Sequence, residues 1–216
     1  MFVGHFGAGL AAKKVNSKIS LGIYILAAQF IDLIWPILIL TGIEKVVVEP
    51  GNTAFTPLNF VSYPFSHSLA AVVGWGVLFG IVYYLFKKDW KGSLLLGLLV
   101  LSHWVLDLIV HRPDLPLVPG SDIKVGLGMW QSVPVTVIFE LAIFAAGIFL
   151  FLKSYKEIDS KFGIRFWSLI IFLTLIYFMN IISPPPPTAK EIGYTGLAMW
   201  VFVLWGFWID KRPKKK

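Results

Sequence analysis

Three side chains that bind metal ions well recur at four-residue intervals in the segment SHWVLDLIVH: His103, Asp107 and His111. At 100° per residue, an α-helix carries these positions within a stripe of ~80° on one face. Imidazole nitrogens and carboxylate oxygens are good ligands for Zn²⁺, and one helix can present two of them to a single ion. The segment therefore predicts a divalent-metal site of zinc type.

Four further ionisable residues stand in or beside apolar segments: His5, Asp32, His67 and Glu140. An ionisable group inside a bilayer costs roughly a few kcal/mol, so each one needs a partner or a function. With a rise of ~1.5 Å per residue, we place the three acids and His103 ~17–23 Å above the cytoplasmic edge. By the same rule His5 reaches ~12 Å into the bilayer, and His67 lies near the outer edge. This shared depth favours a metal or proton site, although a lone histidine in a span more often bonds a neighbouring helix and Glu140 alone fits a neutral buried acid equally well.

The segments that must position these groups are long and apolar. Of the 216 residues, 57% are hydrophobic and 14% are charged, and the mean hydropathy is +0.77. Soluble domains have about 45–50% apolar and about 25% charged residues, so the composition excludes an ordinary soluble fold. The chain has no cysteine, which excludes thiolate metal sites and thiol catalysis.

We predict an all-α fold, a polytopic membrane helix bundle of about six transmembrane helices. The predicted spans are 19–41, 66–86, 92–111, 133–152, 166–183 and 194–209. Residues 1–12 are apolar but too short to span and predict a half-inserted N-terminal helix. We take 1–216 as a single integral membrane domain, with the metal-site core in 1–152 and two additional C-terminal spans in 153–216. Ser66 and Ser68 flank His67, and either could cap the helix that follows; for Ser66, capping is the expected role.

The distribution of Lys and Arg predicts the orientation of these spans. Basic residues gather before the first span, in 87–91, in 153–165 and at the C-terminal end, whereas 42–65, 112–132 and 184–193 hold few. The pattern predicts a multi-pass protein of the inner (plasma) membrane with both termini cytoplasmic. The net charge of +7 then reflects topology, so we expect membrane lipid as a partner and no nucleic acid. Small-residue faces such as Gly76 and Gly80 favour close helix packing and allow a homo-oligomer.

The order of the motifs resembles a known family. His5, Asp32, SHS at 66–68 and HxxxD at 103–107 occur together with the blocks YPFSHSL, SHWVLDLIVHRPDLPL and GLGMWQSVPVTVIFE. This pattern resembles the membrane-bound metal-dependent hydrolases of the bacterial inner-membrane LexA-binding group, which are distantly similar to zinc-dependent phospholipase C. The resemblance covers roughly residues 1–140.

The resemblance implies a centre of one or two divalent ions, with zinc as the expected metal. The main site that it implies consists of Asp32, His67, His103 and Asp107. His5 joins a neighbouring site through Asp107. His111 stands where the related pattern has a further histidine. Glu140 stands for the acid of an HxxxE pair, although the residue four before it is Thr136.

These observations lead us to expect a metal-dependent hydrolase that acts on a phosphoester or lipid head group from the extracytoplasmic side. A bound ion lowers the pKa of water towards ~7, and Asp32 or Glu140, where it is not a ligand, is the candidate general base. A metal-ion or proton transporter is the alternative, because an acid–histidine cluster within the membrane suits it equally. A non-catalytic protein whose helices are stapled by a metal is the third possibility.

Overall fold

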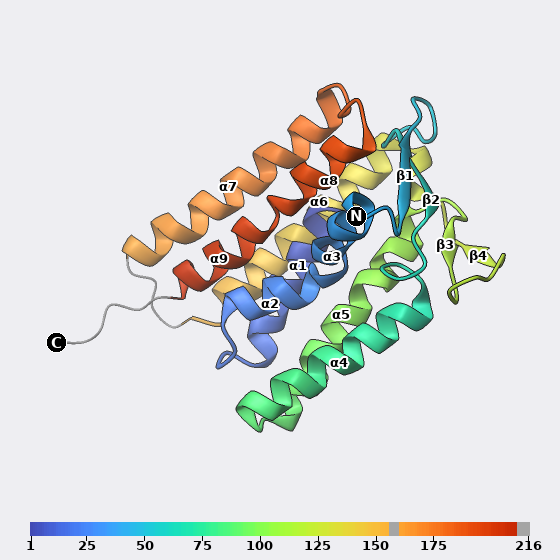
Figure 1. Cartoon of the computed structure of the whole chain (residues 1–216). Helices are drawn as coiled ribbons and strands as arrows, with labels where there is room; N and C mark the ends of the chain where they lie inside the picture. The colour runs from blue at the N-terminus through green and yellow to red at the C-terminus, as the bar shows by residue number, and fades with distance from the viewer. Residues whose placement is uncertain (156–159, 211–216) are drawn as a thin grey trace.

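The computed structural model describes residues 1–155 and 160–210, and 67% of the structure is helical. The first five helices in chain order are α1 (Val3–Val15), α2 (Leu21–Ala28), α3 (Phe30–Leu40), α4 (Leu69–Lys87) and α5 (Trp90–Val110). They are followed by α6 (Val133–Leu152), α7 (Ser160–Ile182), α8 (Ala189–Leu197) and α9 (Trp200–Ile209). The helices lie side by side as one bundle, with α4 and α5 forming an antiparallel hairpin that extends from it (Figure 1).

The prediction of a helical membrane protein is confirmed in one respect: the structure has helices that are long and apolar enough to span a membrane. Within the described residues, five helical segments are long and apolar enough to cross a membrane, and the bent pair α2–α3 makes a sixth if it counts as one span. The span predicted over 19–41 consists of two helices, since α2 and α3 meet at Gln29 at an angle of 55°. Gln29 has φ −101° and ψ 5°, which lies outside the α-helical region and ends the first helix.

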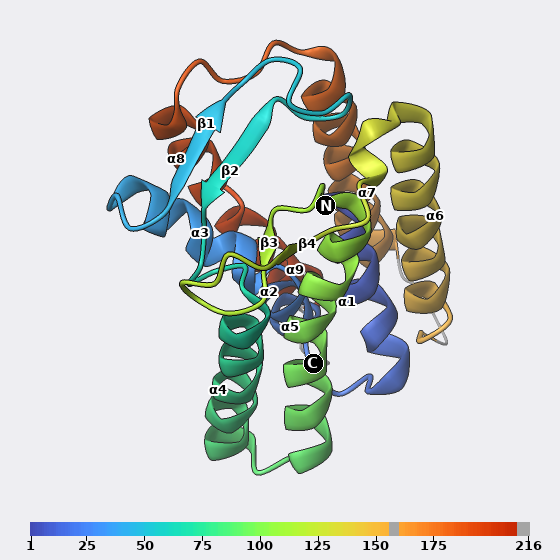
Figure 2. The ribbon, with the colours of Figure 1, turned by 90° about the vertical axis from the view of Figure 1, so that its right-hand side faces the viewer.

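The all-α prediction also omits two short antiparallel hairpins. β1 (Lys45–Val48) pairs with β2 (Leu58–Ser62), and β3 (Leu115–Pro116) pairs with β4 (Lys124–Val125). They fall in the two long loops at 42–65 and 112–132, where valines and other β-branched residues favour extended backbone. β1 and β2 lie at the end of the molecule opposite to the turn between α4 and α5 (Figure 2).

The predicted short N-terminal helix forms as α1 and packs mainly against α6. The two helices approach backbone to backbone, since a Cβ atom added at Gly7 would lie 2.6 Å from the carbonyl oxygen of Ile143. A Cβ at Gly147 would lie 2.2 Å from the carbonyl oxygen of Gly7. This contact fixes the start of α1, with His5, inside the bundle beside α5.

The C-terminal helices pack against the broken pair in antiparallel order, α9 on α2 and α8 on α3. Glycines make both contacts close: a Cβ at Gly206 would lie 2.8 Å from the Cα atom of Gly22, and one at Gly196 would lie 2.5 Å from the Pro36 ring. The break in α2–α3 is thus matched by the break between α8 and α9. These C-terminal helices therefore flank α3, which carries Asp32.

Candidate metal centre

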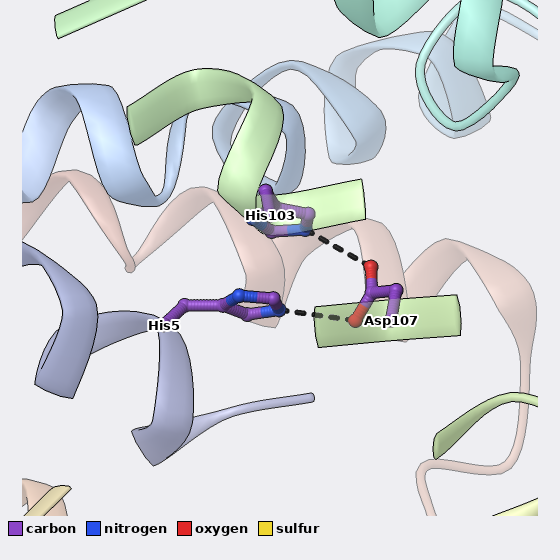
Figure 3. A group of neighbouring side chains, drawn as sticks. All are labelled: His5, His103 and Asp107. Carbon is purple, nitrogen blue, oxygen red and sulfur yellow. Dashed lines mark hydrogen bonds and ion pairs between the residues drawn. The ribbon is translucent and has the colours of Figure 1, made fainter. Parts of the chain in front are cut away.

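Five of the side chains that the sequence singled out lie together in the bundle: His5, Asp32, His67, His103 and Asp107. We call this set the His/Asp cluster. It contains two groups whose ligand atoms all lie within 4.8 Å of one another, His5–His103–Asp107 and Asp32–His67–His103. α5 supplies His103 and Asp107, and α1 brings His5 to the same carboxylate (Figure 3). The four-residue spacing on α5 therefore does bring an imidazole and a carboxylate together.

Two imidazole nitrogens of the cluster lie near two carboxylate oxygens. Nε2 of His67 lies 3.5 Å from Oδ1 of Asp32 and 3.8 Å from Oδ2 of Asp107. Nε2 of His103 lies 3.6 Å and 3.2 Å from the same two oxygens. Zinc–ligand bonds of ~2.0–2.1 Å in tetrahedral geometry put neighbouring ligand atoms ~3.3 Å apart. The four His–Asp distances, 3.2–3.8 Å, are close to this spacing, and the group Asp32–His67–His103 could hold such an ion.

The proton on the His103 ring can be assigned from its neighbour. Nδ1 lies 2.9 Å from the carbonyl oxygen of Ala28, the last residue of α2. A carbonyl only accepts, so Nδ1 carries the hydrogen and the lone pair of Nε2 faces the cluster. The break between α2 and α3 thus has a role in the site, because the carbonyl of Ala28 at the end of α2 accepts a hydrogen bond from the His103 ring.

His67 is oriented by a chain of polar groups that the sequence analysis missed. Its Nδ1 lies 2.7 Å from Oγ of Ser66, whose hydroxyl donates to Oε2 of Glu44 over 2.6 Å. Because that hydroxyl has one hydrogen and gives it to the carboxylate, His67 donates from Nδ1 and leaves Nε2 as the ligand atom. Glu44 is buried, and its Oε1 also accepts from the backbone N–H groups of Phe65 and Ser66, each at 2.8 Å. Glu44 is a lone acid in a loop, so no spacing in the sequence marks it.

The prediction that Ser66 caps the following helix is wrong. α4 begins at Leu69, and Ser68 is its N-cap, with a side chain that accepts from the N–H of Ala71. The extra turn before the helix leaves Ser66 free to bond Glu44. The observed N-cap lies two residues after the predicted one because His67 precedes the helix and is not part of it.

The donor chemistry of the cluster calls for a cation. With both ring hydrogens engaged elsewhere, the Nε2 atoms of His67 and His103 direct lone pairs at carboxylate oxygens, which are also acceptors. Nε2 of His103 makes no hydrogen bond, and the residue is 1% exposed. A buried set of facing acceptors is unfavourable unless a cation or protons lie between them. The cluster therefore could hold a metal ion.

His5 forms the second side of the cluster. Its ring stacks on that of His103 with centroids 3.6 Å apart and planes 6° from parallel. Its Nε2 lies 3.1 Å from Oδ1 of Asp107, the oxygen that also lies 2.7 Å from the Met1 amine. Asp107 thus directs one oxygen at His5 and the other at His67 and His103. Since Nε2 of His103 has one lone pair, a second ion would rest on His5 and Asp107 without it.

Glu140 lies outside both candidate metal groups. Its Oε2 accepts from the N–H groups of Phe2, at 2.8 Å, and Gly4, at 3.3 Å, and so binds the free amides at the start of α1. Its Oε1 is buried and has no partner. The side chain reaches this position from α6 and borders the same cavity as the His/Asp cluster.

His111 also lies outside the two candidate groups. It follows the last residue of α5, and its Nδ1 lies 2.9 Å from Oδ1 of Asp114. The hydroxyl of Tyr63 donates to the same oxygen over 2.8 Å, and Nε of Arg112 donates to Oδ2 over 3.3 Å. Burial alone would raise the pKa of Asp114, but hydrogen bonds from His111 and Tyr63 hold it below its ordinary value. Burial and the Asp114 charge raise the pKa of Tyr63, so the phenol remains the donor.

A cavity of about 590 Å³ opens beside the cluster. Asp32, His67, Asp107, His111 and Glu140 line it, together with residues of α7, α8 and α9. Among the described lining residues there is no lysine or arginine. The sequence analysis gave the C-terminal helices no part in the site, because their residues carry no chemical motif.

Comparison of the chain with protein-family models, with curated proteins and with solved structures found no match. The candidate centre therefore rests on its own geometry: a buried His/Asp cluster that could hold a metal ion, within a helical protein that has several span-capable helices.

Proposed function

We propose that this protein is a metal-dependent hydrolase of the inner membrane that cleaves a phosphoester from the extracytoplasmic side. The observation that carries the proposal is that Nε2 of His67 and Nε2 of His103 each lie 3.2–3.8 Å from oxygens of Asp32 and Asp107, on the border of a large cavity. A divalent ion bound there supplies Lewis-acid chemistry, lowering the pKa of water and polarising a phosphoryl oxygen.

Within this proposal the chain's own acids take separate roles. Asp32 and Asp107 serve as ligands because each has an oxygen within 3.6 Å of Nε2 of His103. Glu140 serves as the general base, since its Oε1 is unpartnered and the residue borders the same cavity. Its other oxygen stays bound to the amides at the start of α1, which fixes the direction in which Oε1 points.

The proposed orientation follows from the basic residues, which favour cytoplasmic placement of the loops at 87–91 and 153–165. The loops that border the cavity, around 55–60 and 185–186, then lie on the extracytoplasmic side. A phosphate without nearby lysine or arginine would be held mainly by the ion. The described lining residues include no lysine or arginine, and the amine of Met1, 2.7 Å from Oδ1 of Asp107, is the cationic group beside the cluster.

The first test is elemental analysis of the purified full-length protein, wild type against His103→Ala. We expect bound zinc or another divalent metal in the wild type and its loss in the variant, because His103 belongs to both candidate groups. His111→Ala is the matched control: it removes a histidine at the end of the same helix that lies outside both groups, so metal content should stay unchanged. Equal metal in wild type and His103→Ala would overturn the metal centre.

The second test separates binding from chemistry. Glu140→Gln keeps an oxygen for the amides of α1 but removes the base, so metal content should persist while phosphoester turnover falls about 10²–10⁴-fold. Turnover is measured as phosphate or head-group release from phospholipid in mixed micelles, with and without a chelator. Metal uptake into proteoliposomes without turnover of any phosphoester would instead identify a transporter, and unfolding on chelation with no chemistry would identify a structural metal.

A further inference from the structure

The side of the cavity opposite the cluster is built from the C-terminal helices. Its apolar residues come from α7, α8 and α9, and we call them the C-terminal wall: Phe172, Ile176, Tyr177, Ile192, Met199 and Phe202. None carries a charge. Asp32, His67, Asp107, His111 and Glu140 line the same cavity, so one space has both polar and hydrocarbon lining.

Unpartnered hydrogen-bond donors are concentrated around this cavity. Among the described residues, Nε1 of Trp35, Nε1 of Trp130 and the hydroxyl of Tyr177 have no partner; these atoms are buried, and other atoms of the three residues line the cavity. Two other indoles have partners: Trp75 donates to the carbonyl of Phe65 and Trp104 to that of His67. Native proteins pair nearly all buried polar groups, so several unpaired donors around one cavity indicate a ligand with acceptor atoms.

A series of aromatic rings connects His111, which lines the cavity outside the cluster, to the C-terminal wall. The ring of Trp130 lies 4.1 Å from that of His111, and Phe55 stacks on Trp130 at 6.4 Å. Phe55 in turn lies 6.2 Å from the ring of Tyr177 on α7. The loop that carries Phe55 thus connects the polar side to the C-terminal wall, and its backbone N–H is fixed to the carbonyl of Trp130 at 3.0 Å.

We propose that the C-terminal wall binds the hydrocarbon chain of an amphiphilic phosphoester whose phosphate lies at the His/Asp cluster. The placement of the phosphate depends on the proposed function, whereas the placement of the hydrocarbon chain depends only on the C-terminal wall. The ester or hydroxyl oxygens between the two ends accept from the indole of Trp130 and the hydroxyl of Tyr177. A water-soluble phosphoester with a polar leaving group would instead meet an uncharged, mostly aromatic and aliphatic surface.

The volume and chemistry of the cavity agree with this substrate class. About 590 Å³ lies within the ~300–1,000 Å³ that small-molecule sites usually have. Each methylene transferred from water to an apolar site improves affinity about fourfold, so chain length should dominate selectivity. We therefore expect a phosphonate with a twelve-carbon chain to bind far more tightly than ethylphosphonate.

The test is photo-crosslinking with a dodecylphosphonate that carries a diazirine at the end of its chain, on the zinc-supplemented full-length protein in maltoside detergent. The carbon–phosphorus bond is not hydrolysed, so labelling requires no turnover. We expect label on peptides from 172–202, with at least about tenfold less when Ile176→Trp fills the wall. Ile171→Trp is the matched control, because Ile171 lies on the same helix but is 58% exposed on its outer face.

The outcomes separate the two proposals. Label on 172–202 that is blocked by Ile176→Trp supports the chain site even if no phosphoester is ever hydrolysed. Label confined to α4 and α5, or equal competition by ethylphosphonate and unlabelled dodecylphosphonate, overturns it whatever the enzyme activity. If Ile176→Trp fails to fold, Tyr177→Phe provides the second variant, with label reduced about threefold through the lost hydrogen bond.

Discussion

The two sides of the cavity differ in how their polar atoms are satisfied. In the His/Asp cluster, His103 is held by the carbonyl of Ala28 and His67 by Ser66, so each ring is oriented by a contact outside the cluster. On the C-terminal wall, the hydroxyl of Tyr177 is equally buried but has no partner. One side has oriented imidazoles and could hold a metal ion, whereas on the other side the hydroxyl of Tyr177 has no partner among the described residues.

Because of this difference, substitutions on the two sides should have different effects. Supports of the cluster are part of a satisfied network, so removing one leaves buried groups unpaired and disturbs the ligand atoms. The unpartnered polar atoms of the wall do not stabilise the ligand-free protein. Their removal should therefore have a measurable effect only when a ligand is bound. Substitutions on the two sides therefore test whether the contrast is real.

The largest effect is expected from Ser66→Ala, which removes the oxygen between Glu44 and His67. Losing a contact that orients a metal-bound histidine typically weakens metal binding 10–100-fold, or about 1.4–2.8 kcal/mol. Competition for Zn²⁺ against a chromophoric chelator measures the change. Glu44→Gln should have an effect in the same direction, because the amide is a weaker acceptor for the Ser66 hydroxyl than a carboxylate.

Ser68→Ala is the matched control for this measurement. Ser68 lies on the other side of His67 and caps α4 without touching the ring, so its loss should cost about 0.5–2 kcal/mol of folding stability. Metal affinity should stay at the wild-type value. Unchanged affinity in Ser66→Ala, or equal losses in the two variants, would mean that the Glu44–Ser66 chain does not orient His67.

A smaller effect is expected for Asp114→Asn. This variant tests a hydrogen-bonded group on the polar side of the cavity that does not contact the ligand atoms of the cluster. The pKa of Asp114 is lowered in the folded protein, so its contribution is complete above the ordinary value of about 3.9 and is lost as pH falls through the lower folded value. The variant should be about 1–2 kcal/mol less stable at pH 6, because hydrogen bonds to a charged carboxylate are the stronger ones. The difference from wild type should shrink below about pH 4.

Thermal unfolding in detergent across pH 3–7, with wild type and variant measured in parallel, follows this difference. Metal affinity at pH 7 serves as the internal control and should be unaffected, since Asp114 contacts His111 rather than the cluster. A stability difference that persists undiminished at pH 3 would show that Asp114 acts through its shape and not through its charge.

The sequence predicted the elements well but only part of the arrangement. The four-residue spacing of His103 and Asp107, and the apolar setting of Asp32, were sufficient to indicate a cluster, because a helix converts spacing into a shared face. His111 follows the same spacing, yet it lies just beyond the end of α5, where the chain turns it towards Asp114. Glu44 and the C-terminal wall were missed because their roles depend on contacts between segments distant in the sequence, which no local pattern encodes.

The smallest effect is expected for a pair of matched tyrosine substitutions, which also compare the two sides most directly. Tyr63 and Tyr177 are 2% and 1% exposed, and they differ in that the first hydroxyl donates to Asp114 whereas the second has no partner. Tyr63→Phe should therefore cost about 1–1.5 kcal/mol of stability, while Tyr177→Phe should change stability by less than about 0.5 kcal/mol or raise it slightly. Both variants keep the ring, so packing is matched and unfolding in ligand-free detergent reports the hydroxyl alone. Equal losses at the two positions would mean that Tyr177 already has a partner in the empty protein, and the wall would then have no hydrogen bond left to offer a ligand.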